Sequence, residues 1–135
     1  MNAAIEFHDS ECLALEVDSQ GGGSVLLNAY VHRTVGEPGI SPGEGGVQRV
    51  RLKVGAMRVI GDVGDLPASI YDGSIVVGTS ALDVLIPFPS NYSEAVSITL
   101  TLLDNAREIV VSGVGLSIEA ESEFKFVEDV DLSTH

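Results

Sequence analysis

Residues 96–120 read VSITLTLLDNAREIVVSGVGLSIEA, and this stretch indicates the fold class. Its first seven residues alternate apolar and hydroxyl side chains, a period of two that is typical of a strand with one buried face. After a turn at Asp104 and Asn105 the alternation returns, so we expect an antiparallel hairpin. In the returning strand the apolar phase slips near Gly113, which predicts a β-bulge. The residues expected to point inward there are Ile109, Val111, Val114, Leu116 and Ile118.

The same period extends over most of the chain. It predicts strands over residues 3–8, 13–17, 24–34, 47–54, 57–60, 74–78, 82–88 and 124–126, with turns at Asp9-Ser10 and Asp72-Gly73. Helical patterns are confined to single turns at 79–84 or 91–95. About nine or ten strands at intervals of about 8 to 12 residues predict an all-β fold. We expect a two-sheet antiparallel β-sandwich of jelly-roll or immunoglobulin-like kind, with a small β-barrel as the alternative.

Length and composition predict one domain with a core of its own. The chain has 135 residues, of which 44% are hydrophobic and 5% aromatic, and it lacks tryptophan. The core must therefore consist mainly of Val, Ile, Leu and Ala. We expect a single domain over residues 1–127, followed by an acidic tail over residues 128–135 (EDVDLSTH).

The charge of the chain narrows the classes of partner. Twenty acidic and seven basic residues give a net charge of −13, which disfavours nucleic acid and anionic membranes. An acidic surface serves solubility, and it also suits a basic protein partner or a bound cation. The single cysteine excludes an internal disulfide, and the chain does not open with a basic, apolar signal segment. We therefore expect a soluble cytoplasmic protein.

Residues 5–18, IEFHDSECLALEVD, contain five consecutive side chains of types that act in catalysis, from His8 to Cys12. A catalytic triad requires side chains that converge from different parts of a fold, whereas neighbours on a strand diverge. Asp9 and Ser10 favour a turn in which both side chains bond nearby backbone amides. Cys12 lacks a basic neighbour that would activate its thiol, so we expect it to be buried. No catalytic residue is predicted here.

A metal site is a weaker hypothesis. Imidazoles from His8 and His32, with Asp9 or Glu6, could supply part of a zinc shell, but their spacing matches no established zinc motif. We therefore predict neither a metal nor a cofactor. The alternative to a non-enzymatic protein is a small-molecule or metal-dependent site, with or without enzymatic activity, centred on His8, Asp9 and His32.

Polar side chains opposite the apolar phase of three strands form a candidate binding face. If these strands are neighbours, the face combines mixed charge with a tyrosine, and Tyr and Arg are common anchors of interfaces. Its residues are Glu6, His8, Asn28, Tyr30, His32, Arg49 and Arg51, with Lys53 beside them. We therefore predict a non-enzymatic interaction domain that engages a basic protein partner. Edge strands near Pro87 or the C-terminus could pair between chains, so a monomer and a homodimer both remain open.

The first part of the chain carries a family resemblance. Residues 5–18, with AYVHR at 29–33 and VQR at 47–49, resemble a group of uncharacterised small bacterial all-β proteins that open with a Phe-His-Asp-Ser segment. The resemblance implies a bacterial β-protein and carries no assigned activity. A looser similarity to small immunity proteins of bacterial toxin systems implies, as one concrete version, an inhibitor of a basic toxin. The second half of the chain does not share the resemblance.

Overall fold

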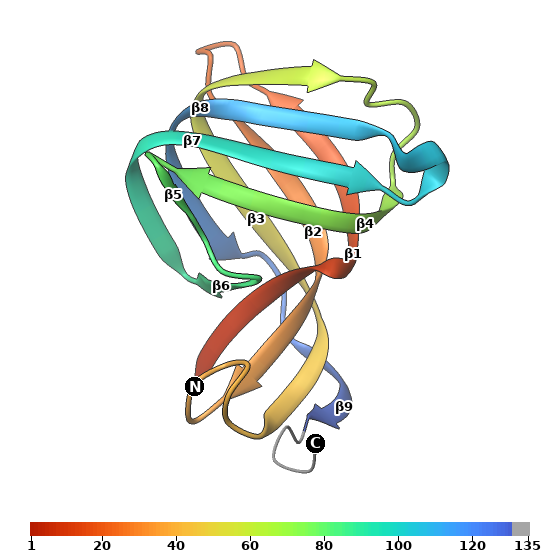
Figure 1. Cartoon of the computed structure of the whole chain (residues 1–135), viewed down its shortest axis with the longest axis vertical. Helices are drawn as coiled ribbons and strands as arrows, with labels where there is room; N and C mark the ends of the chain where they lie inside the picture. The colour runs from red at the N-terminus through yellow and green to blue at the C-terminus, as the bar shows by residue number, and fades with distance from the viewer. Residues whose placement is uncertain (131–135) are drawn as a thin grey trace.

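The computed structural model describes residues 1–130, except for the side chain of residue 105, and consists mainly of β-strands (Figure 1). The strands are β1 (Asn2–Val17), β2 (Gly23–Thr34), β3 (Gly43–Gly61), β4 (Ala68–Val77), β5 (Ser80–Ala81), β6 (Leu85–Phe88), β7 (Ser90–Leu102), β8 (Glu108–Ala120) and β9 (Lys125–Val130). A single 3₁₀ turn, η1 (Asp104–Ala106), joins β7 to β8. The predicted all-β fold and the turn after β7 are confirmed. No helix in this part of the chain is long and apolar enough to cross a membrane.

Six antiparallel strands close into a barrel in the order β4-β7-β8-β3-β2-β1. The closure is short: β1 returns to β4 through the pairs Glu11–Ser69 and Cys12–Ala68. The expected two-sheet sandwich is therefore not what the chain forms, and the small barrel, held as the alternative, describes it. Alternation could not separate the two, because strands of both architectures bury one face. In a barrel the first and last strands of the sheet pair with each other, and in a sandwich they do not.

Three of the barrel strands continue beyond the barrel as an arm (Figure 1). The arm consists of the first half of β1, the second half of β2 and the first half of β3. Strand β6 pairs with β1 at residues 3–6, and β9 pairs with β3 at residues 43–47. Residues 128–130, where a tail was expected, belong to β9, and residues 131–135 lie outside the described part of the chain.

The barrel encloses a core of aliphatic side chains. The largest fully buried residues are Ile5, Leu27, Leu52, Ile75, Ile86, Ile98, Leu100, Leu102, Ile109, Ile118, Val25 and Val31. Each such side chain contributes about 1.5–3 kcal/mol relative to an exposed one. In the strands predicted over residues 24–34 and 47–54, the apolar residues opposite the predicted polar face are all buried, which confirms the predicted inward phase; they are Val25, Leu27, Ala29, Val31, Val50, Leu52 and Val54.

The bulge predicted in β8 is present, but it lies at Gly115 rather than at Gly113. Val114 pairs with Gly55 and Leu116 pairs with Val54, which leaves Gly115 unpaired at a φ of 85°. Val114 keeps the phase of the strand before the bulge and points outward, where it is 59% exposed, and the extra residue Gly115 brings Leu116 to the buried face. The prediction that Val114 points inward was therefore wrong.

Two predicted turns are instead strand. Asp9 and Ser10 lie within β1, which runs without a break where two short strands were expected. Asp72 and Gly73 lie within β4, beside a register shift in its pairing with β7. A Cβ on Gly73 would lie 2.6 Å from the ring of Phe7, so the glycine there accommodates core packing. Of the predicted helical turns, residues 91–95 lie within β7 and residues 79–84 contain β5.

Candidate functional site

Residues 7–10, within the segment IEFHDSECLALEVD at 5–18, form a bulge of four residues in β1. Glu6 pairs with Tyr30 and Glu11 pairs with Asn28, so residues 7–10 face a single residue of β2. Asp9 takes a φ of 71°, in the left-handed region that Asp tolerates better than most residues. Strand β1 bends here, as bulged strands do.

Ser10 holds the bulge together. Its hydroxyl is buried and donates a hydrogen bond to the carbonyl oxygen of Glu6. It also accepts a hydrogen bond from the backbone N–H of Tyr30, with 2.9 Å between Oγ and N. The side chain thus satisfies a backbone donor that the interrupted ladder would leave unpaired. The prediction that Asp9 and Ser10 bond nearby backbone amides in a turn was wrong, because Ser10 bonds the Glu6 carbonyl and the Tyr30 amide of the partner strand and stabilises a bulge.

The bulge also changes the neighbour of β1. Before the bulge β1 pairs with β6, and after it β1 pairs with β4 and closes the barrel. The bend therefore has a role in the fold that is independent of any ligand, and it turns the side chains of His8 and Asp9 toward solvent.

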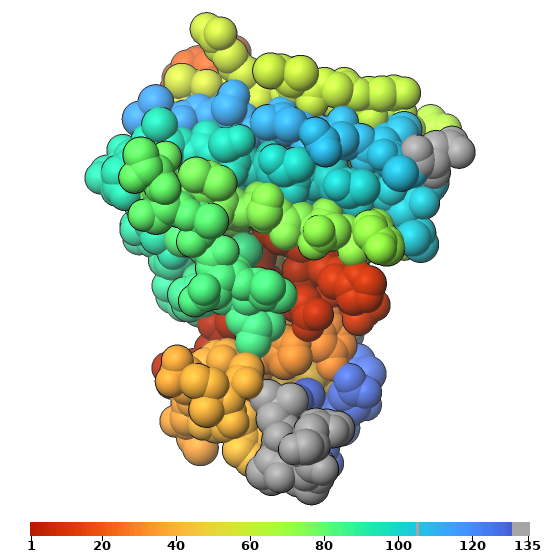
Figure 2. All heavy atoms as spheres, in the orientation of Figure 1, coloured from red at the N-terminus to blue at the C-terminus, as the bar shows by residue number. Residues whose placement is uncertain are grey.

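Beside the bulge lies a hollow of about 380 Å³, which we call the bulge groove. It is lined by His8, Asp9, Glu11 and Asn28 from β1 and β2 and by Ser69, Tyr71 and Leu103 from β4 and the end of β7. Figure 2 shows β1 (red) exposed directly below β4 (green) on one face of the molecule. The groove brings the predicted site residues His8 and Asn28 together with Tyr71, which the sequence pattern did not single out.

His8 is fixed at the rim of this groove. Its Nδ1 lies 2.7 Å from the carbonyl oxygen of Tyr71, and its Nε2 lies 3.7 Å from the Asp9 carboxylate. The hydrogen bond to the Tyr71 carbonyl, and next the negative charge of Asp9, raise the pKa of His8 above its ordinary value. The rings of His8 and Tyr71 meet edge to face with centroids 6.2 Å apart.

His32 belongs to a different set of contacts, on the arm. Its Nε2 lies 2.7 Å from the Glu6 carboxylate, and its ring packs edge to face on Tyr30. The hydroxyl of Tyr30 donates to Glu128 on β9, and burial together with this bond raises the pKa of Tyr30 to about 12. His8 and His32 therefore have different partners. Within residues 1–130 no three His, Cys, Asp or Glu side chains are placed to hold a metal ion.

The residues of the predicted face lie on three neighbouring strands, because β2 lies between β1 and β3, and its arginines are both on β3. Arg51 is held by three partners: Ser24 at 2.7 Å, Glu16 at 3.3 Å and Glu121. Its pairing with Glu121 raises the pKa of Arg51 and lowers that of Glu121. Lys53 pairs with Glu119 at 3.2 Å. Arg49 lies opposite Asn28 and is exposed.

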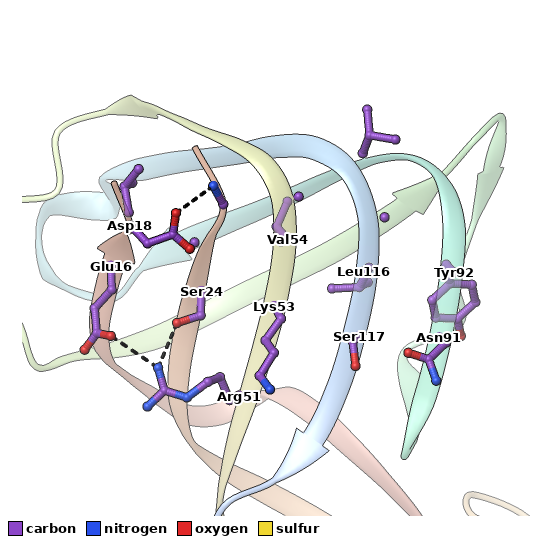
Figure 3. Close-up of a pocket in the computed structure, with 16 residues that line it drawn as sticks. Glu16, Asp18, Ser24, Arg51, Lys53, Val54, Asn91, Tyr92, Leu116 and Ser117 are labelled. Carbon is purple, nitrogen blue, oxygen red and sulfur yellow. Dashed lines mark hydrogen bonds and ion pairs between the residues drawn. The ribbon is translucent and has the colours of Figure 1, made fainter. Parts of the chain in front are cut away.

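A second and larger hollow, of about 640 Å³, lies over the outer surface of the barrel; we call it the outer groove. Figure 3 shows Glu16, Ser24 and Arg51 gathered at one end of it, with Asn91 and Tyr92 on the strand opposite. Its charged side chains serve the fold: Arg51 ties strands together, and the Asp18 carboxylate accepts the amides of Gln20 and Gly22 in the β1–β2 turn. Sequence patterns did not reveal this groove, because its lining comes from five separate segments of the chain.

Cys12 is fully buried in the barrel core. Burial raises the pKa of its thiol to about 11, so the reactive thiolate is scarce at neutral pH. This agrees with the expectation that Cys12 is a core residue.

Comparison of the chain with protein-family models, with curated proteins and with solved structures found no match. The resemblance to small bacterial β-proteins therefore stays a prediction.

Proposed function

We propose that the protein is a non-enzymatic interaction domain that binds a basic protein partner through its acidic surface. The observation that carries this proposal is the charge left over after the internal ion pairs have formed. Four of the seven basic side chains in residues 1–130 pair with carboxylates, namely Arg33, Arg51, Lys53 and Arg107. Within residues 1–130 most carboxylates form no ion pair with a lysine or arginine, and they carry the excess negative charge of the surface.

The position of these pairs supports a basic partner over an acidic one. Of the cations of the predicted binding face and beside it, Arg51 and Lys53 are engaged by carboxylates of the chain itself, and Arg49 is exposed. A surface of surplus negative charge accelerates the approach of a positively charged partner and disfavours acidic ones.

The candidate catalytic side chains support a non-enzymatic role. Ser10 is buried and bonds two backbone groups, and Cys12 is buried in the core. Neither is placed as an activated nucleophile, which needs an adjacent base and access to substrate.

The test begins with capture from lysate of the source cells, after which each captured protein is purified and measured alone by isothermal titration calorimetry. We expect at least one basic protein to bind with a defined stoichiometry and to lose affinity steeply as NaCl rises. Binders that are all acidic, or whose affinity does not respond to salt, would contradict the proposal. Failure to find any basic protein that binds when purified would contradict it as well.

A further inference from the structure

Resting on the proposed function, we propose that the bulge groove is the pocket that receives one cationic side chain, a lysine or an arginine, of that basic partner. The groove offers three things that recognise such a side chain: carboxylates for its charge, apolar surface for its stem, and a rigid rim.

The lining of the groove is negatively charged. Asp9 and Glu11 line it, and Asp72 lies close enough to act on the charge of His8. No lysine or arginine is among the residues that line it, and within residues 1–130 neither carboxylate pairs with a lysine or arginine; Asp9 lies 3.7 Å from the imidazole of His8. The outer groove differs in this respect, since Arg51 and Lys53 line it and offset its carboxylates.

The apolar surface of the groove comes from two exposed side chains. Tyr71 is 57% exposed and Leu103 is 63% exposed, and both line the groove. The amide of Leu103 donates to the carbonyl oxygen of Ser69, which holds this residue beside β4. A lysine or arginine stem packs on such surface, and its charged end gains from the face of an aromatic ring.

The rim is held in place before any ligand arrives. Ser10 ties the bulge to both Glu6 and Tyr30, so the backbone that carries Asp9 and Glu11 is braced across two strands. When neutral His8 donates its Nδ1 proton to the Tyr71 carbonyl, its Nε2 is a free acceptor beside Asp9. Groups that are already ordered lose little entropy on binding, which favours affinity.

The test uses NMR of the full chain with three small probes: N-acetyl-arginine methylamide, N-acetyl-lysine methylamide and the neutral arginine isostere N-acetyl-citrulline methylamide. We expect the two cationic probes to shift the amide resonances of residues 8–11, 28 and 69–71, with the citrulline probe leaving them in place. Shifts spread evenly over the acidic surface, or equal shifts with citrulline, would overturn the proposal.

Variants separate the groove from general charge. Asp9→Asn tolerates the same positive φ, and combined with Glu11→Gln it removes two charges at nearly constant shape. The matched control, Asp83→Asn with Glu123→Gln, removes two charges from exposed positions outside the groove lining. We expect the groove pair to weaken probe binding by about fivefold or more, and the control pair to leave it nearly unchanged. Tyr71→Ala should weaken binding without altering net charge.

The same variants distinguish this inference from the proposed function. If a purified basic protein binds and both variant pairs weaken it equally, the groove assignment is wrong and the proposed function stands. If the probes bind in the groove and no basic protein binds, the proposed function is wrong, and the groove is a site for small cations.

Discussion

The side-chain oxygen of Ser10 lies 2.9 Å from the backbone nitrogen of Tyr30 and takes the place of a main-chain acceptor across the bulge in β1. One hydroxyl thus stabilises the bend at which β1 leaves β6 and meets β4. Ser10, for which a turn was predicted, is therefore a structural element of the barrel closure.

Ser10→Ala should therefore destabilise the protein by about 1–3 kcal/mol, because it leaves the Tyr30 amide buried without a partner. Urea unfolding followed by circular dichroism measures the loss. Ser74→Ala, at an exposed position of β4, is the control and should change stability by less than about 0.5 kcal/mol. Equal effects of the two substitutions would show that Ser10 does not brace the bulge.

The two glycines at the β8 bulge should respond differently to substitution. A Cβ on Gly113 would collide with the carbonyl oxygen of Gly55, whereas Gly115 has room but takes a φ of 85°. Gly115→Asn should be tolerated better than Gly115→Ala, because Asn adopts positive φ more readily. At Gly113 both Ala and Asn should be destabilising by about 1–3 kcal/mol through overpacking. Thermal unfolding of the four variants tests this. A Gly113→Asn variant that is clearly more stable than Gly113→Ala would contradict it.

Cys12 should react with thiol reagents only when the barrel opens. Its side chain is buried and its thiol pKa is raised to about 11, so both access and thiolate are lacking at neutral pH. The rate of reaction with dithionitrobenzoate should rise steeply with urea, in parallel with unfolding. Rapid labelling in the absence of urea would mean that the β1–β4 closure opens in the native state.

His8 should titrate above 6.5, its ordinary value, because the Tyr71 carbonyl and then Asp9 favour its protonated form. Since the pKa is raised on folding, the stabilisation is complete below about pH 6.5 and is lost as pH rises through the folded pKa. An NMR titration of the His8 ring measures this pKa. Asp9→Asn should lower it in part and leave the contribution of the Tyr71 carbonyl. An unchanged pKa in this variant would show that Asp9 does not act on His8.

The groove should bind cations less well as His8 takes up its proton. A protonated imidazole offsets the charge of Asp9 and loses its free acceptor at Nε2. Binding of N-acetyl-arginine methylamide should therefore weaken as pH falls through the pKa of His8. In His8→Gln this dependence should be absent, and its persistence would assign the effect to another group.

Much of the local structure could be predicted from residue order. Alternation identified the inward residues of β2 and the middle of β3, and the phase slip in β8 indicated a bulge. The prediction of local structure failed at residues 7–10 of β1, where the Ser10 hydroxyl replaces a backbone acceptor. Asp and Ser are common in turns, so the sequence predicted a turn at Asp9 and Ser10. Only the hydrogen bond between Ser10 and the Tyr30 amide on β2 shows that these residues belong to a bulge.

The candidate site was predictable only in part. His8 and Asn28 were identified from their outward phase, and they do lie together at the bulge groove. Tyr71 and Leu103 were missed, because they lie far along the chain and reach β1 only through the closure of the barrel. The three strands that carry the predicted face are neighbours, but the pairing of Arg51 and Lys53 with Glu16, Glu119 and Glu121 depends on side-chain contacts between strands.

The sequence by itself determined that the chain is all-β, that its core is aliphatic and that its surface is strongly acidic, because each follows from composition and from a two-residue period. Only the tertiary structure decided that the sheet closes into a barrel, that Ser10 braces a bulge and that His8 faces Tyr71. The physical reason is that period and composition report which face of a strand is buried. The identity of its neighbour is set by bends and pairings between residues far apart in the chain.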